Sequence, residues 1–168
     1  MPNWCNNNIS ITGPNSVIDK IEKIVKEESN NAENGLLQFF HPMPKELLET
    51  EAGPIAKTKK EKQARQARKL EFGAENWYDW RVNNWGTKWD ACEGSIDSEG
   101  KYELNFSFDT AWSPPTPWLQ KVTEKYRLLK FTLEYTEEGM GFEGKTFARN
   151  GEMEDNCMQI NYPDRFFD

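Results

Sequence analysis

Hydrophobic residues near the start of the chain first alternate with polar ones and then recur at helical spacing. Between Trp4 and Thr12 the alternation predicts a strand with one apolar face. In residues 15–25 the apolar positions predict an amphipathic helix. Those positions are Val17, Ile18, Ile21, Ile24 and Val25. The short apolar run Leu36–Phe40 ends before two prolines and predicts a second strand.

Residues 45–86 interrupt this pattern with helical segments of another composition. Residues 57–72 are rich in Ala, Lys, Arg, Gln and Glu, which favour a helix, and offer few apolar side chains for docking. We therefore expect an exposed, solvated helix there that contributes little to folding. Residues 75–85 are aromatic and predict a further helix, which Gly86 closes.

The second half of the chain returns to strand patterns. Residues 90–97 and 101–110 predict a hairpin, and residues 129–135 predict the strand that follows a helix beginning among the prolines at 114–117. Residues 142–149 and 152–162 flank Asn150-Gly151 and predict a terminal hairpin. In the arm 101–110, the side chains predicted to face the core are Tyr102, Leu104, Phe106 and Phe108.

Together these elements predict an α+β fold: a ferredoxin-like antiparallel sheet with helices on one face. The expected order is β-α-β, a helical insertion, β-β-α-β and a C-terminal β-hairpin. We predict a single domain over residues 1–168, because no linker separates two parts. The helical insertion at 45–86 is expected between strands 2 and 3.

Charge is unevenly distributed along the chain. The net charge is −7, yet residues 55–70 contain seven basic residues and one acidic residue. An acidic protein is a poor general binder of nucleic acids or membranes. The basic helix 57–69 is the one segment that could contact phosphates by charge, whereas most such runs are simply a solvated helix face.

No motif in the sequence points to catalysis, a metal or a cofactor. The three cysteines form no CxxC pair, and the single histidine, His41, has no local nucleophile partner. We therefore predict no catalytic residues, no metal site and no cofactor, although pairs of carboxylates leave a small enzyme open. The N-terminal residues do not form a signal peptide and no apolar stretch has membrane-spanning length, so we expect a cytoplasmic protein that does not bind membranes.

Tryptophans and polar residues gather in the loops between elements. Four of the seven tryptophans lie between residues 77 and 89, where they either hold the insertion on the core or offer rings for a flat ligand. The hypothesis for a ligand site combines flat apolar contact, a cation for an anion, and carboxylate acceptors at element ends. Its residues are Trp85, Lys88, Asp90, Trp112 and Glu137. The alternative is that Lys88 pairs with Asp90 or Glu137 while the rings close the core.

Five short motifs, taken in order, resemble the YubB-type ferredoxin-like domain family. They are Met1-Pro2-Asn3-Trp4-Cys5-Asn6-Asn7, Phe40-His41-Pro42-Met43-Pro44, Trp85-Gly86-Thr87-Lys88-Trp89-Asp90, Thr110-Ala111-Trp112-Ser113-Pro114-Pro115 and Tyr135-Thr136-Glu137-Glu138-Gly139. Members of that family are phage, plasmid and bacterial proteins, often labelled Api92-like. The resemblance runs from residue 1 to about 145 and leaves out the tail 146–168. It implies a ferredoxin-like fold and an origin in mobile genetic elements, and it implies no activity.

These observations favour a non-catalytic binding protein of phage or mobile-element origin that sequesters a small ligand or a host protein. Two other functions stay open. One is a nucleic-acid binder that uses the basic helix 57–69, and the other is a small enzyme with its site in the aromatic loops.

Overall fold

The computed structural model describes residues 3–28, 35–53, 56, 58–100 and 102–160, without the side chains of residues 28 and 92–100. The chain begins with β1 (Trp4–Thr12), α1 (Asn15–Glu28), α2 (Leu36–Phe40), the single 3-10 turn η1 (Lys45–Leu47), α3 (Lys59–Phe72) and α4 (Trp77–Trp85). It continues with β2 (Cys92–Gly100), β3 (Glu103–Ala111), α5 (Thr116–Lys125), β4 (Lys130–Glu137), β5 (Phe142–Arg149) and β6 (Glu152–Gln159).

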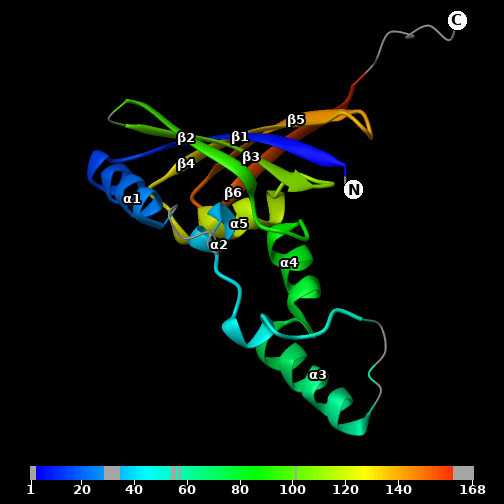
Figure 1. Ribbon diagram of the computed structural model, residues 1–168. Coiled ribbons are helices and arrows are strands. Elements are labelled where there is room, and N and C mark those ends of the chain that lie inside the picture. The colour runs from blue at the N-terminus through cyan, green and yellow to red at the C-terminus, as the bar shows by residue number, and fades with distance from the viewer. Residues whose placement is uncertain (1–2, 29–34, 54–55, 57, 101, 161–168) are drawn as a thin grey trace, which may run out of the picture.

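The strands form one antiparallel sheet in the order β2-β3-β1-β4-β5-β6. Its first four members have the strand order of a ferredoxin-like fold, with α1 and α5 as the connecting helices. Helices α1, α2 and α5 lie on one face, and none of the described helices lies on the other face (Figure 1). The hairpin β5-β6 extends the sheet beyond β4. The predicted α+β, ferredoxin-like fold is therefore confirmed.

The run Leu36–Phe40 forms helix α2, so the prediction of a strand there is wrong. A short apolar run fits a buried helix turn as well as a buried strand. Leu37 and Phe40 are three residues apart, so a helix places both side chains on the face that packs against the core. Both are buried, and this burial favours the helix over a strand. The second strand of the ferredoxin-like core is thus β2. The helical insertion consequently lies between α1 and β2, not between strands 2 and 3.

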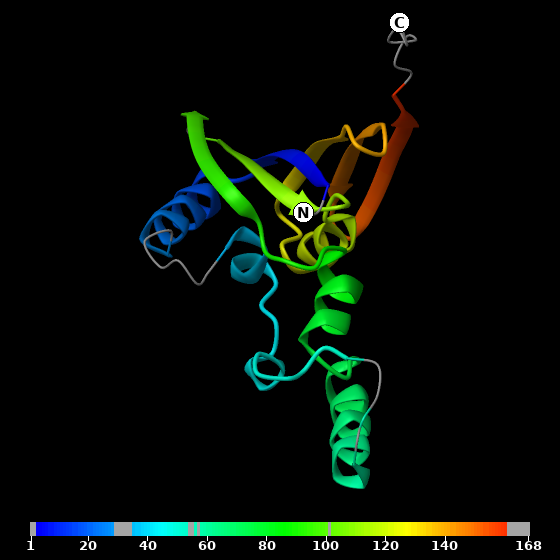
Figure 2. The same cartoon turned by 45° about the vertical axis from the view of Figure 1, so that its right-hand side comes forward.

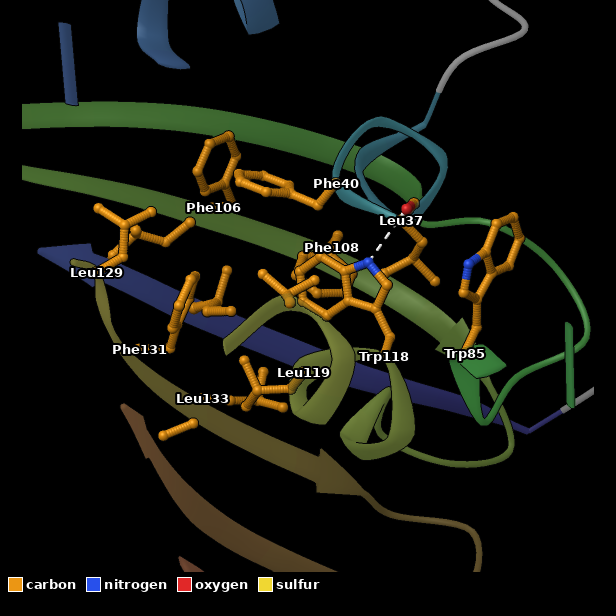
Figure 3. Packing of buried hydrophobic residues seen from close by; sticks show 14 of the residues in the cluster. Leu37, Phe40, Trp85, Phe106, Phe108, Trp118, Leu119, Leu129, Phe131 and Leu133 are labelled. Atoms are coloured by element: carbon orange, nitrogen blue, oxygen red, sulfur yellow. Dashed lines mark hydrogen bonds between the residues drawn. The ribbon is translucent and has the colours of Figure 1, made fainter. Parts of the chain in front are cut away.

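The core lies between the sheet and the helices α1, α2 and α5 (Figure 3). Leu104, Phe106 and Phe108 of β3 are buried, as their alternation predicts. Tyr102 is 63% exposed, because β3 begins only at Glu103 and Tyr102 belongs to the preceding turn. At the centre of the core, the indole N–H of Trp118 donates a 3.1 Å hydrogen bond to the carbonyl of Leu37, which ties α5 to α2.

Helices α3 and α4 form an arm that projects away from the sheet (Figure 2). Thr58 caps the start of α3 by accepting a hydrogen bond from the N–H of Glu61, and Gly73 ends the helix in a left-handed conformation with φ 75°. The predicted exposure holds for the lysines of α3 but is wrong for Arg65, which is buried. Within the described residues, no helix is long and apolar enough to cross a membrane.

Candidate ligand-binding cleft

A cleft of about 730 Å³ lies at the base of the arm. Three parts of the chain enclose it: the segment before α3, the two arm helices, and the loops of the sheet body. Its aromatic lining consists of Trp77 and Tyr78 from α4 and Trp112 from the loop after β3. Its other lining residues are Ala52, Gly53, Arg65, Glu75, Asn76, Asp79 and Lys88. The cleft therefore combines flat rings with charges of both signs.

Trp112 has a backbone conformation that a bulky residue rarely adopts. Its φ is 68°, in the left-handed region, and such a conformation costs about 1–3 kcal/mol outside glycine. Its N–H donates a 2.9 Å hydrogen bond to the carbonyl of Asn3. The next residue, Ser113, donates from its hydroxyl to the carbonyl of Gly86 at 2.6 Å, and Thr87 exchanges two hydrogen bonds with Ala111. These bonds hold the strained loop in place.

The ring of Trp112 belongs to a stack of three indoles. Its centroid lies 6.5 Å from that of Trp89, with an angle of 27° between the rings. Trp89 lies 6.1 Å from Trp4 at an angle of 37°, and the ammonium of Lys88 sits 4.8 Å from the centroid of Trp89. Trp112 nevertheless remains 43% exposed. Trp89 thus packs against the ring of Trp112, and Trp112 at the same time lines the cleft.

The start of α4 provides the other aromatic residues of the cleft lining. Asn76 caps the helix by accepting a 3.0 Å hydrogen bond from the N–H of Asp79. The N–H of Trp77 donates to the hydroxyl of Thr50 at 3.0 Å, and the guanidinium of Arg81 lies 5.3 Å from the centroid of the Trp77 ring. Trp77 is therefore oriented by contacts with its own helix and with the segment before α3.

The two cations of the cleft differ in their partners. Arg65 donates to the carbonyl of Gly53 at 2.6 Å and to the carboxylate of Glu61 at 2.9 Å, and it lies 4.0 Å from the carboxylate of Glu75. These acceptors largely neutralise its charge. Lys88 forms no ion pair with any described residue, and its contact with the ring of Trp89 leaves its charge unbalanced. Of the two, Lys88 is the cation better placed to meet an anionic ligand.

Trp85 and Asp90, two further residues of the sequence hypothesis, are not among the residues that line the cleft. Trp85 is fully buried, and its indole N–H donates to the carbonyl of His41 at 2.9 Å. The carboxylate of Asp90 accepts hydrogen bonds from the start of α2. Burial raises the pKa of the Asp90 carboxyl, while three backbone N–H donors and the charge of Arg81 act in the opposite direction.

Glu137 organises the turn after β4. Its carboxylate is buried and accepts hydrogen bonds from the N–H of Gly139 at 2.9 Å and of Met140 at 2.6 Å. A side chain at Gly139 would collide with Asn3, the residue whose carbonyl holds Trp112. Glu137 therefore lies in the neighbourhood of the Trp112 loop through Asn3, yet outside the cleft lining.

Of the five residues in the sequence hypothesis, the structure brings Lys88 and Trp112 together at one cleft. Sequence reasoning missed Tyr78 and Arg65 as lining residues. Trp77 and Trp80 are three residues apart in the cluster of tryptophans at 77–89, a spacing that places both on one helix face, but Trp80 packs in the core and only Trp77 lines the cleft. The spacing of Glu61 and Arg65, one helical turn apart, was the available sign that Arg65 is held inward.

Other hollows lie on the sheet. One is a groove of about 890 Å³ along β4, β5 and β6, and among the described residues that line it Phe147 is the exposed aromatic one. Three cations and two carboxylates surround it: Arg127, Lys130, Arg149, Glu152 and Glu154. The smaller cleft at the arm gathers three large rings, so it is better suited to recognise a flat molecule. Among the described residues, no group of three or more His, Cys, Asp or Glu side chains is placed to hold a metal ion.

Comparison with known proteins supports the architecture. Residues 84–161 match the model of a family described as the ferredoxin-like domain in Api92-like protein. The match includes β5 and β6, so it reaches into the tail that the sequence resemblance leaves out. The crystal structure of the protein Api92 from Yersinia pseudotuberculosis is similar, with a TM-score of 0.59 and 11% sequence identity over 97% of this chain and 99% of that chain. No curated protein matches the chain.

Proposed function

We propose that this protein is a non-catalytic binding protein whose cleft holds a planar ligand against Trp112. The observation that supports this most directly is the placement of Trp112, a partly exposed indole in a strained left-handed conformation that a hydrogen-bonded loop maintains. Strain of this kind is more often retained at functional sites than in ordinary loops. Preorganised rings also bind at a lower entropic cost than rings that must first be ordered.

The polar groups around the cleft favour binding over catalysis. The carboxylate of Asp79 accepts a 2.7 Å hydrogen bond from the side-chain amide of Asn76, and Glu75 lies near Arg65 and Lys69. The single histidine stacks on Trp80, with 5.3 Å between ring centroids, and does not line the cleft. The lining thus offers shape, rings and one unbalanced cation, which are the components of a recognition site.

A wider biological role is part of the same proposal. Motifs of the YubB type support an origin in a phage or another mobile element, where a small binding protein would act on a host molecule in the cytoplasm. The ligand is then the planar group of a small molecule or of a host macromolecule.

Calorimetric titration with a panel of planar compounds tests the proposal. The panel contains nucleobases, nucleosides, nucleotides, flavins and aromatic amino acids. We expect at least one class to bind, and Trp112→Ala to weaken it by about 5- to 150-fold, the equivalent of 1–3 kcal/mol for one stacking contact. Phe147→Ala is the matched control, because Phe147 is an exposed aromatic residue on β5 that belongs neither to the indole stack nor to the cleft lining. Unchanged affinity in a folded Trp112→Ala protein would overturn the proposal.

A further inference from the structure

The outer face of α3 carries lysines that no described residue balances. Lys59, Lys60 and Lys62 are exposed and form no ion pair with the described part of the chain. Lys69 extends the same face, and its ammonium lies 3.8 Å from the carboxylate of Glu75. The one acidic residue in the first two turns, Glu61, pairs inward with Arg65 instead.

Helix α1 shows what a solvated charged face looks like in the same protein. There Lys23 pairs with Glu27, and Lys26 pairs with Glu22, each across one helical turn. In α3 the corresponding positions after Lys59, Lys60 and Lys62 hold Gln63, Ala64 and Gln66. Like charges without such partners repel one another and weaken a helix. The lysines of α3 therefore lack the acidic partners that stabilise a solvated helix face, and their unbalanced positive charge is suited to bind a polyanion.

The position of the arm keeps this charge effective. Helix α3 points away from the acidic sheet body in both views (Figures 1 and 2). A helix of 14 residues is about 21 Å long, and charges are screened over about 8 Å at physiological salt. Most of the lysine face is thus beyond the reach of the carboxylates on the body.

We propose that α3 binds the phosphate backbone of a single-stranded nucleic acid, and that one base of this strand enters the cleft and stacks on Trp112. The lysine face reaches the cleft through Lys69, because its partner Glu75 lines the cleft together with Trp77. A row of cations beside aromatic rings is the combination that holds single strands. A single strand fits these features better than two other polyanions. An acidic protein could pair with the lysines but would leave the aromatic rings unused. The bases of a duplex are stacked inside the helix and cannot reach the ring of Trp112. The base contact rests on the proposed function, whereas the phosphate contact does not.

Fluorescence anisotropy with a labelled thymidine oligonucleotide of about 12 residues tests this inference, since single-strand sites span about 4–16 nucleotides. The triple variant K59Q/K60Q/K62Q is compared with K20Q/K23Q/K26Q, which removes the same number of charges from α1. We expect the α3 variant to bind at least tenfold more weakly, with a salt slope lowered by about 2 between roughly 50 and 200 mM NaCl. The α1 variant should behave like the unmodified protein.

Several results would overturn the inference. They are no binding by the unmodified protein at the lowest salt, equal losses in the α3 and α1 variants, and displacement of the oligonucleotide by polyglutamate at equal concentration. The last of these would identify an acidic protein as the partner. Trp112→Ala should weaken oligonucleotide binding without changing the salt slope, and an unchanged affinity would overturn the base contact. If a planar compound binds through Trp112 while the oligonucleotide does not bind, the inference falls and the proposed function stands.

Discussion

The carboxylate of Asp90 accepts a 2.8 Å hydrogen bond from the backbone N–H of Leu37, a residue 53 positions earlier in the chain. Its second oxygen accepts from the N–H of Gln38 at 3.0 Å. These donors belong to the first turn of α2, whose N–H groups have no partner within the helix. A side chain at Gly35 would collide with the same carboxylate. Asp90 thus fixes the start of α2 against the chain that leads into β2.

Replacing Asp90 by Ala should therefore destabilise the protein. Two partly buried N–H groups lose their acceptors, and each such loss costs about 1–3 kcal/mol. Asp90→Asn keeps one acceptor oxygen, so its free energy of unfolding should lie between those of the unmodified protein and of Asp90→Ala. Urea unfolding measures the change in the free energy of unfolding. Asp109→Ala is the control, because Asp109 bonds with Asn6 on the uncovered face of the sheet. Equal stability of the Asp90→Ala and Asp109→Ala proteins would contradict this role.

Two phenylalanines on opposite faces of the sheet test the position of the core. Phe108 is 3% exposed and Phe147 is 48% exposed. Phe108→Ala should cost about 3–5 kcal/mol, which can unfold a domain of ordinary stability. Phe147→Ala should change stability by at most about 1 kcal/mol. Thermal unfolding monitored by circular dichroism compares the two variants. If Phe147→Ala lowered the melting temperature more than Phe108→Ala, the faces of the sheet would be assigned wrongly.

Among the basic residues of α3, Arg65 should contribute more to stability than the exposed lysines. Lys59, Lys60 and Lys62 are exposed, so changing each to Gln should alter stability by at most about 0.5 kcal/mol. Arg65→Gln removes the donors to Gly53 and Glu61 and should cost about 1–3 kcal/mol. Melting temperatures and hydrogen exchange in α3 measure both effects. If the triple lysine variant had a melting temperature as low as that of Arg65→Gln, the lysines would contribute to folding and the prediction would be wrong.

His41 should make the protein less stable as the pH falls. Burial lowers the pKa of its imidazole below 6.5, despite a hydrogen bond with Asn84 that acts in the opposite direction. The unfolded chain then binds the proton first, so stability is complete above pH 6.5 and is lost as the pH falls through the folded pKa. An NMR titration reads this pKa directly, because the chain has one histidine. A folded-state pKa at or above 6.5 would refute the prediction, and His41→Gln should remove this part of the pH dependence.

The thiols of Cys5 and Cys157 should react at very different rates. Cys5 is fully buried in the core, and burial raises its pKa to about 12, whereas Cys157 on β6 is exposed. Since the thiolate is the reactive form, iodoacetamide at mildly alkaline pH should modify Cys157 first and Cys5 only after unfolding. Peptide mapping by mass spectrometry distinguishes the two sites. Comparable labelling of both in the folded protein would place Cys5 outside the core.

Several features followed from the sequence because they depend on local pattern. Alternation in residues 103–111 and 130–137 determines which side chains face the core, and Phe106 and Phe108 are buried as predicted. The left-handed Gly86 ends α4 where a glycine after an aromatic helix is expected. The turn Asn150-Gly151 likewise joins β5 and β6, with both residues at positive φ.

Tertiary contacts decided what local pattern left open. The run Leu36–Phe40 suits a strand or a helix, and it became α2 because the Asp90 carboxylate caps its first turn and the body buries Leu37 and Phe40. Lys88 and Trp112 are separated in sequence and meet at the cleft because the arm returns to the sheet beside the loop after β3. Trp85 and Trp112 both stand at the ends of elements, yet Trp85 is buried and bonds to the carbonyl of His41, whereas Trp112 lines the cleft. Spacing along a chain reports which residues share a face, but long-range packing determines which of those faces another element covers.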